Sequence, residues 1–181
     1  MSAQSLAALL ALLPTTRGLA WTLGDVLFRP AQSSEAPLIL SRLIREKMNP
    51  IGLQPEHFLI ACDKPSGEVA GFGQIRPLGA QACELASLVV EPRYRGLGLG
   101  TVLVTKLLAK HRASEEAGKP VFLLTLASTV PFYERLGFSL VADPPTPMKF
   151  EMAAGSVVAK LATGKQIVCM GASKELVVAE T

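Results

Sequence analysis

The chain carries, between residues 84 and 101, the stretch Glu84-Leu-Ala-Ser-Leu-Val-Val-Glu-Pro-Arg-Tyr-Arg-Gly-Leu-Gly-Leu-Gly-Thr101. Its first half is apolar and predicts a strand over 83–90, and its second half is a glycine-rich turn leading into a predicted helix over 101–112. Glycines at 96, 98 and 100 let the backbone turn its N–H groups toward one point, and the helix adds the positive end of its dipole. Arg93 and Arg95 add full positive charge. The stretch therefore predicts a phosphate-binding turn between a strand and a helix.

The spacing of these glycines separates the known classes of phosphate-binding loop. A dinucleotide fingerprint that starts at Gly96 needs Gly or Ala at position 101, where the chain has Thr101. A nucleoside-triphosphate loop needs a lysine after its last glycine, but Gly100 is followed directly by Thr101. Both a nucleotide-dependent oxidoreductase and a nucleotide hydrolase are therefore disfavoured, and a turn without any ligand is the plain structural alternative.

The composition is that of a globular protein with a sizeable core. The chain has 181 residues, of which 49% are hydrophobic and 18% charged, which fits one domain. A net charge of +3 gives no reason to expect a nucleic-acid partner. The apolar run over residues 6–13 is shorter than the roughly 20 residues of a membrane helix, so no membrane association is expected.

Cysteine and histidine usage argues for an intracellular protein without a metal. The cysteines are odd in number and form no C-x-x-C pair, so a disulfide framework is disfavoured and a reducing compartment favoured. The two histidines do not stand at ligand spacing from each other or from the cysteines. No basic residue precedes the first apolar run, so secretion is also disfavoured.

Apolar periodicity predicts alternating strands and helices on both sides of the central stretch. Strands are expected at 21–30, 57–61, 68–75, 121–125, 138–141 and 166–170, and further helices at 34–48, 131–136 and 153–162. The turn sequence Lys64-Pro-Ser-Gly67 makes the second and third strands an antiparallel pair. The apolar stripe of the first helix is predicted at Leu38, Leu40, Leu43, Ile44 and Met48. These elements form one mixed α/β domain over 21–172, with a tail or short helix at 1–20 and a tail at 173–181.

Two motifs in this order resemble those of the GNAT superfamily of N-acetyltransferases. Arg95-Gly-Leu-Gly-Leu-Gly100 matches the acyl-CoA diphosphate loop R/Q-x-x-G-x-G/A, and Pro131-Phe-Tyr-Glu-Arg-Leu-Gly-Phe138 resembles the FYxxxGF element. The resemblance covers about residues 26–141. It implies the GNAT fold: a central, mostly antiparallel sheet flanked by helices and splayed between the strands at 83–90 and 121–125, with acetyl-CoA in the splay.

The resemblance extends to one branch of that superfamily. Met48-Asn-Pro50, Gly73-Gln-Ile-Arg76 and Val168-Cys-Met170 look most like the plant-plastid and cyanobacterial members. This similarity implies a location in the cytoplasm or the plastid stroma. An acid-free start that contains Arg17 is compatible with the remnant of a transit peptide, and a short amphipathic helix or frayed tail is the alternative.

The resemblance also implies two catalytic side chains. Glu84, eleven residues before Arg95, matches the position of a glutamate general base in some members. Strand alternation predicts that Glu84, Ala86, Leu88 and Val90 share one face, whose apolar character would raise the pKa of the carboxyl; a solvated strand edge is the alternative. Tyr133 is the candidate donor of a proton to the departing thiolate, and simple core packing is its alternative.

Contacts with the acyl-CoA are implied along the strand, the turn and the region after the fifth strand. The strand near Val90 would also offer a backbone N–H to the oxyanion if a bulge frees that donor. Many relatives carry an asparagine after the fifth strand, which Thr125 or Ser128 would replace here. The implied cofactor-binding residues are Leu88, Val89, Val90, Arg95, Gly96, Leu97, Gly98, Leu99, Gly100, Thr101 and Ser128.

These motifs predict transfer of the acetyl group of acetyl-CoA to a primary amine by direct attack in a ternary complex, without a metal. The acceptor is a protein lysine, an N-terminus or a small-molecule amine, contacted by the loops at 45–56 and 142–148. A catalytically silent acyl-CoA-binding sensor or scaffold is the alternative. No cysteine has a partner for a nucleophilic dyad, so a route through an acyl-cysteine is disfavoured. A homodimer is expected if the last strand forms an exposed sheet edge.

Overall fold

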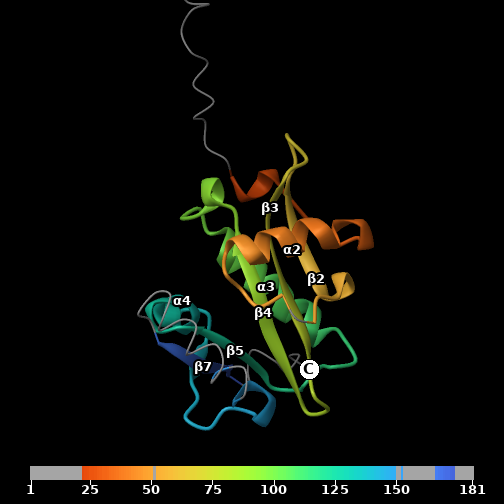
Figure 1. The fold of residues 1–181 in the computed structure, drawn as a ribbon. Helices are drawn as coiled ribbons and strands as arrows, with labels where there is room; N and C mark the ends of the chain where they lie inside the picture. Colours follow the sequence, from red (N-terminus) through yellow and green to blue (C-terminus); the bar gives the residue numbers. More distant parts are fainter. Residues whose placement is uncertain (1–21, 51, 150–151, 153–165, 174–181) are drawn as a thin grey trace, which may run out of the picture.

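The computed structural model describes residues 22–50, 52–149, 152 and 166–173, and in them one sheet dominates the architecture (Figure 1). Seven strands lie in the order β1-β2-β3-β4-β5-β7-β6. All neighbours are antiparallel except β4 and β5, which run parallel. The strands are β1 Val26–Pro30, β2 Phe58–Asp63, β3 Val69–Leu78, β4 Ala82–Val90, β5 Val121–Leu126, β6 Phe138–Leu140 and β7 Ile167–Ala172.

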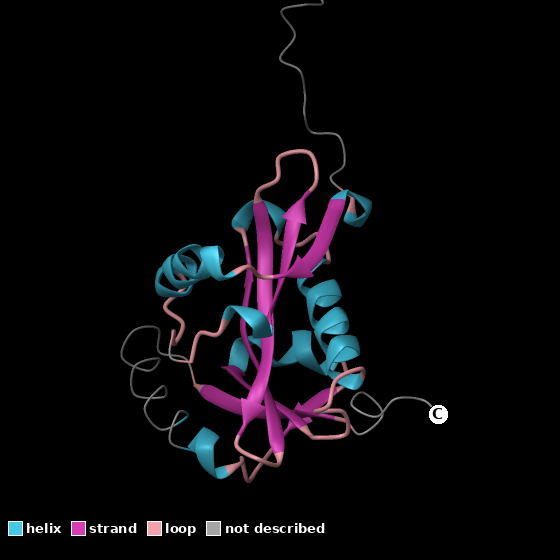
Figure 2. Cartoon of the chain, turned by 90° about the vertical axis from the view of Figure 1, so that its right-hand side faces the viewer, coloured by secondary structure: helices cyan, strands magenta, loops and turns pink. Residues whose placement is uncertain are grey.

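Helices cover both faces of this sheet. The α-helices are α2 Ala36–Arg45, α3 Leu99–Arg112 and α4 Val130–Glu134, and short 3-10 turns occur at Leu23–Asp25, Ser33–Glu35, Pro55–His57, Pro92–Tyr94 and Ala127–Thr129. Figures 1 and 2 show α2 and α3 on opposite faces of the long strands. The predicted mixed, mostly antiparallel α/β architecture is confirmed. Within the described residues, no helix combines the length and apolar character needed to cross a bilayer.

Each face has its own core. The α2-side cluster contains Ile39, Phe58 and Phe72, while the α3-side cluster includes Leu85 and Leu103. Both clusters consist of fully buried aliphatic and aromatic side chains, whose removal from water is the main stabilising contribution to the fold. The sheet is therefore a partition between two separately packed halves.

The predicted splay lies between β4 and β5. These strands pair only where both begin, with Cys83 opposite Val121 and Glu84 opposite Phe122. Beyond those two positions β5 continues its pairing with β7 rather than with β4. The opening between the two parallel strands therefore widens toward their carboxyl ends, with Glu84 at its closed end.

An extra residue interrupts β4 beside this opening. The ladder between β3 and β4 skips one position, so that Gly73 lies opposite both Ser87 and Leu88. Ser87 takes a φ of 56°, a left-handed conformation that is rare for a residue other than glycine. Gly73 permits the close approach, because a Cβ at this position would lie 3.2 Å from the Leu88 side chain. The bulge expected in this strand is thus present, slightly before Val90.

This bulge makes the predicted face assignment wrong. Leu88 and Val90 pack with the α3-side cluster, whereas Val89 belongs to the α2-side cluster. Glu84 and Ala86 therefore do not share a face with Leu88 and Val90, as uninterrupted alternation would require. One additional residue reverses the side on which every later side chain of a strand points.

The last strand is interior rather than an edge. β7 pairs with β5 on one side and with β6 on the other, which leaves the short β6 at the end of the sheet. The prediction of an exposed last strand is wrong because residues 138–140 return to cover it. The expected homodimer through that edge loses its structural basis.

Two local predictions also change. A 3-10 turn at Leu23–Asp25 precedes β1, because the Asp25 carboxylate accepts bonds from the Thr22 backbone N–H and hydroxyl at 3.0 and 2.9 Å. α2 ends at Arg45 rather than near residue 48. The predicted helix at 153–162 and nearly all of both predicted tails lie outside the described residues.

The predicted apolar stripe of α2 is confirmed at Leu43, which is buried, and at Leu38 and Met48, which pack against the α2-side cluster, but Ile39 is buried in place of Leu40 and Ile44. Ile39 and Leu43 are 0% and 1% exposed, whereas Leu40 and Ile44 are 40% and 61% exposed. Both pairs have the four-residue spacing of a helix face, so periodicity alone does not distinguish them. The sheet contact determines which pair is buried.

Alanine substitutions will separate the two faces of α2. Ile39→Ala removes a fully buried side chain and is expected to lower the free energy of unfolding by roughly 2–5 kcal/mol, whereas Ile44→Ala should change it by no more than about 0.5 kcal/mol. Urea unfolding of the two variants measures the difference. Equal destabilisation by both substitutions would contradict this orientation of the helix.

Candidate functional site

The glycine-rich turn forms an open N-terminus for α3. Gly96 and Gly98 have φ values of 78° and 83°, and Gly98 is the residue that caps the helix. The helix begins at Leu99, two residues before the predicted start. No side chain caps this end, and its first turn contains no acidic residue. The first backbone N–H groups of α3 are therefore available to an anion such as a diphosphate.

The two arginines predicted beside the turn have different positions. Arg95 donates from Nε to the Val90 carbonyl at 2.8 Å, and its Nη2 lies 3.0 Å from a Glu46 carboxylate oxygen. Arg93 instead contacts Glu68 at 2.5 Å and the Tyr94 hydroxyl. The expectation that both arginines serve the turn is corrected, because Arg93 is engaged by the β2–β3 hairpin.

The side chains of the remaining predicted cofactor-binding residues differ in their exposure to solvent. Leu97 is 44% exposed, and Thr101 is also exposed, whereas Leu99 is buried in the α3-side cluster. Val89 is buried on the α2 side. Leu88 and Val90 are half-buried on the α3 side, next to the opening between β4 and β5. Leu99 and Val89 can therefore contact a ligand only through their backbone atoms.

Aromatic packing brings Tyr133 to the same region. A Cβ at Gly100, in the first turn of α3, would lie 3.5 Å from the Phe132 ring, so α4 packs against the turn. The Tyr133 ring makes edge contacts with Phe132 and Phe138, with centroid distances of 4.8 and 5.9 Å. Burial raises the pKa of Tyr133 to about 12, and a hydrogen bond with Thr125 opposes this shift. The phenol is therefore protonated, and able to donate, at neutral pH.

Near the end of β5, threonine and serine side chains occupy the region where many relatives carry an asparagine. The hydroxyls of Thr125 and Thr129 are 2.5 Å apart, and Thr129 donates to the Leu126 carbonyl at 2.8 Å. Ser128 is exposed in the 3-10 turn at the end of β5. Thr125 is thus engaged within the protein, while Ser128 faces outward.

Glu84 is a buried partner of an arginine. Its side chain is 6% exposed and accepts a hydrogen bond from Arg76 Nε at 2.8 Å, and the distance to Arg76 Nη2 is 2.7 Å. The two residues lie directly opposite each other on β4 and β3. The expected apolar surroundings of Glu84 are therefore wrong, because a guanidinium compensates its charge.

Sequence reasoning missed a further polar residue on this face. Gln74 is 1% exposed, and its amide donates to the Ser87 hydroxyl at 3.1 Å, within the β4 bulge. A usable signal was present, since Gln74 and Arg76 alternate within an otherwise apolar strand. The same face thus carries an amide, a guanidinium and a carboxylate.

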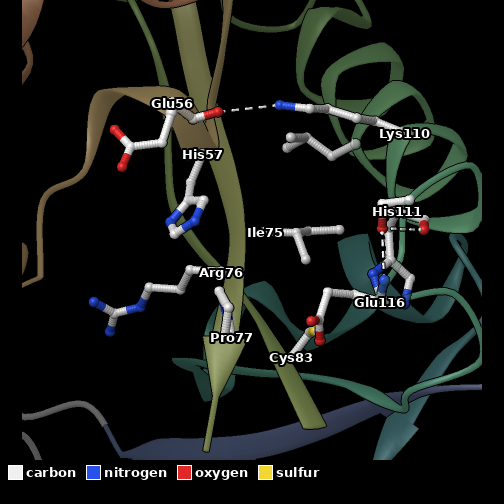
Figure 3. Close-up of a pocket in the computed structure, with 11 residues that line it drawn as sticks. Glu56, His57, Ile75, Arg76, Pro77, Cys83, Lys110, His111 and Glu116 are labelled. Atoms are coloured by element: carbon white, nitrogen blue, oxygen red, sulfur yellow. Dashed lines mark hydrogen bonds between the residues drawn. The ribbon is translucent and has the colours of Figure 1, made fainter. Parts of the chain in front are cut away.

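A pocket of about 210 Å³ lies elsewhere, at the C-terminal end of α3 (Figure 3). Its lining includes His57, Cys83, Lys110 and His111 but no predicted site residue. Figure 3 shows Arg76 extending away from Lys110 and His111, toward the other face of β3. The described residues include no group of three or more histidine, cysteine or acidic side chains able to hold a metal.

The cysteines are poor nucleophiles. Cys62, Cys83 and Cys169 are all buried free thiols. Burial raises the pKa of both Cys83 and Cys169 to about 11, so these two thiols are protonated at neutral pH. Both side chains belong to the buried core of the protein.

Comparisons with known proteins identify the family of this site. Residues 25–138 match the model of the acetyltransferase (GNAT) family. A glucosamine 6-phosphate N-acetyltransferase of Trypanosoma brucei brucei is 33% identical over 85 residues, which cover 44% of this chain and 56% of the relative. The chain thus spans little more than half of that curated relative.

Solved structures share the fold at low sequence identity. N-acetylglutamate synthase from Neisseria gonorrhoeae, complexed with coenzyme A and N-acetyl-glutamate, has a TM-score of 0.62 and 18% identity, covering 81% of this chain and 34% of that one. Escherichia coli ElaA has a TM-score of 0.61 and 14% identity, covering 82% of this chain and 99% of that one.

The protonation of Tyr133 can be measured directly because the chain has only two tyrosines. We expect an ultraviolet titration to show a phenol with a pKa of about 12, above the ordinary value of about 10, because burial disfavours the tyrosinate. Tyr133→Phe should remove that transition. If the transition that Tyr133→Phe removes is centred near pH 10, while circular dichroism shows the protein to be folded, the buried position of Tyr133 would be contradicted.

Proposed function

Because the chain belongs to the GNAT acetyltransferase family, we propose that it transfers the acetyl group of acetyl-CoA to a primary amine by direct attack in a ternary complex. The observation that carries the proposal is the uncapped N-terminus of α3, preceded by two glycines of positive φ and placed beside the β4–β5 opening. A Cβ at Gly96 would meet no atom within 4 Å, so this side of the turn has room for a ligand.

The diphosphate is proposed to bind across this turn. Backbone N–H groups of Gly96 to Thr101 and the positive end of α3 would receive the phosphate oxygens. Arg95, with its side chain 51% exposed, would exchange its contact with Glu46 for a phosphate. The pantetheine arm would then follow Leu88 and Val90 into the opening, with Ser128 at its outer rim.

The β4 bulge is proposed to stabilise the charge that develops on the thioester oxygen. Ser87 and Leu88 share one opposite residue on β3, Gly73, so the regular ladder cannot pair both of their N–H groups in the usual way. A donor fixed by the fold beside the reacting carbonyl stabilises the transition state without first having to reorient. This role would belong to the backbone near Leu88 to Val90.

Glu84 is proposed as the proton acceptor for the amine. A primary amine with a pKa near 10.4 is protonated at neutral pH and must lose a proton before it attacks. Arg76 forms an ion pair with the Glu84 carboxylate, and each carboxylate oxygen can accept more than one hydrogen bond. Glu84 lies on the same strand as the bulge, at the closed end of the β4–β5 opening.

Tyr133 is proposed as the donor of a proton to the CoA thiolate. Its phenol is protonated at neutral pH, and its ring is fixed between Phe132 and Phe138. The family resemblance of the motif at 131–138 supports this role. The protein would then supply a proton acceptor on β4 and a proton donor on α4, from opposite sides of the opening.

The acceptor is proposed to be a primary amine of a protein or a small molecule. The sequence resemblance at 48–50, 73–76 and 168–170 supports the plastid and cyanobacterial branch, which favours protein lysines or N-termini and a location in the cytoplasm or stroma. The name of the trypanosomal relative favours an amino-sugar phosphate instead. A thiol-release assay with amines of both kinds, followed by mass spectrometry of the products, distinguishes these classes.

The pairing of Glu84 with Arg76 favours one rival function. A carboxylate engaged by a guanidinium is a weaker base than a free one, which suits an acyl-CoA-binding sensor or scaffold without turnover. Acetyl-CoA would still raise the melting temperature of such a protein, because a ligand that binds only the folded state stabilises it. Thiol release would occur only in an enzyme.

Arg95 and Arg93 provide a matched pair for testing the diphosphate site. We expect Arg95→Ala to weaken acetyl-CoA binding by roughly tenfold or more, because a charge-assisted bond to phosphate is lost. Arg93→Ala should leave the affinity unchanged, since this side chain contacts Glu68. Calorimetric titration measures both affinities. Equal losses in the two variants would place the diphosphate elsewhere.

Replacing Tyr133 by phenylalanine tests the proton donor. The substitution keeps the packing with Phe132 and Phe138 but removes the hydroxyl, so we expect a loss in kcat of roughly 100-fold. Acetyl-CoA affinity should not change, because the hydroxyl is proposed to act on the thiolate as it departs. Unchanged turnover would show that Tyr133 is only a packing residue.

A further inference from the structure

The side-chain amide of Gln74 forms a hydrogen bond through its nitrogen but not through its oxygen. Its Nε2 donates to the Ser87 hydroxyl at 3.1 Å, whereas Oε1 is buried and accepts no hydrogen bond from the described residues. Gln74 is 1% exposed, so bulk water does not satisfy this oxygen. Buried carbonyl oxygens are rarely left without a partner, because the missing bond is costly. The open oxygen therefore points to a ligand that supplies a donor.

Gln74 lies on the same face of the sheet as Glu84. Ile75 and Leu85 pack on the α3 side. Successive side chains of a strand point to opposite faces, so the residues just before them, Gln74 and Glu84, lie on the other face of the sheet. Gln74 is directly opposite Ala86, two residues along β4 from Glu84. Such diagonal neighbours on one face are within reach of long side chains. Gln74 and Glu84 thus share one face of the sheet on neighbouring strands.

The loop after α2 covers this face. Gly52 has a φ of 73°, and a Cβ at this position would collide with the Arg76 guanidinium. Met48 and Leu53 pack against the α2-side cluster. The loop therefore closes over Arg76 and Glu84, on the side of the sheet opposite α3 and its diphosphate turn. A second substrate bound between this loop and the sheet would face the side chains of Gln74 and Glu84.

We propose that Gln74 Oε1 accepts a hydrogen bond from the nitrogen of the acceptor and thereby selects primary over secondary amines. This inference rests on the proposed acetyl transfer. In that reaction the acceptor ammonium first loses one proton through Glu84 to solvent. The neutral nitrogen then bonds to the acetyl carbonyl carbon, the carbon–sulfur bond breaks, a second N–H proton passes to Glu84, and the thiolate takes the Tyr133 proton.

The selectivity follows from counting N–H groups. A neutral primary amine has two: one is lost to Glu84, and the other remains bonded to Gln74 throughout the reaction. A neutral secondary amine has only one, which must leave, so that Gln74 Oε1 is again unpaired in the product. A buried polar group that one substrate satisfies and another leaves unpaired discriminates strongly between them.

Methylamine and dimethylamine are suitable probes because both are small enough to enter an acceptor site of any shape. The variant Gln74→Met keeps the length of the side chain and removes the oxygen. We expect kcat/KM for methylamine to fall roughly tenfold and that for dimethylamine to stay constant, so that the selectivity ratio falls by the same factor. Acetyl-CoA affinity, measured by calorimetry, should be unchanged.

Two further variants separate recognition from structure. Gln81→Met makes the same chemical change at an exposed position in the β3–β4 hairpin and should have no effect. Ser87→Ala removes the bond that holds the Gln74 amide but keeps Oε1, so the selectivity ratio should fall less than in Gln74→Met. An equal fall in Ser87→Ala would show that Gln74 acts only through the bulge and would overturn the inference.

The remaining outcomes distinguish the inference from the proposed function. A protein that neither binds acetyl-CoA nor releases thiol refutes the acetyltransferase itself. A protein that binds acetyl-CoA but releases no thiol with any amine refutes it as well. A protein that acetylates methylamine with the same selectivity in Gln74→Met as in the unmodified form refutes only the role of Gln74.

Discussion

The extra residue in β4 is the constraint on which the arrangement of the site depends. Without it, Glu84, Leu88 and Val90 would point to one side of the sheet. The left-handed backbone at Ser87 instead sends Leu88 and Val90 to the α3 side and leaves Glu84 on the other. A single strand thereby contributes an apolar lining to one half of the molecule and a charged group to the other. Gly73 makes this possible by leaving space for Leu88.

The charged groups around the opening are held by opposite charges from neighbouring elements. Arg76 compensates Glu84 across the β3–β4 ladder, and Glu46 contacts Arg95 from the end of α2. Glu91, just after β4, receives both Arg42 and Arg45. Partly buried ion pairs of this kind add little net stability, because desolvation offsets much of their attraction. Their effect here is to fix the position of α2 and its following loop relative to the turn before α3.

Local sequence patterns were most informative where the residues of a motif follow one another in a single short stretch. The turn at 95–100 and the element at 131–138 indicated the family, which the family match confirms, and a splay between β4 and β5, which the structure confirms. Periodicity was less informative for α2, where Ile39 with Leu43 and Leu40 with Ile44 have equal spacing. The partner of Glu84 was also out of reach, because Arg76 is brought opposite it by the register of a hairpin rather than by any local pattern.

The amino-acid sequence by itself determined the order of elements, the glycine-rich turn before α3 and the family, because glycine conformation, helix polarity and apolar runs are local properties. Only the tertiary structure decided which side of the sheet each side chain of β4 faces, which strand forms the edge, and that Arg93 belongs to the hairpin while Arg95 belongs to the turn. These outcomes depend on strand register and on contacts between distant segments. For the side chains of β4, a shift of one residue in register reverses the face to which each one points, without any visible change in composition or periodicity.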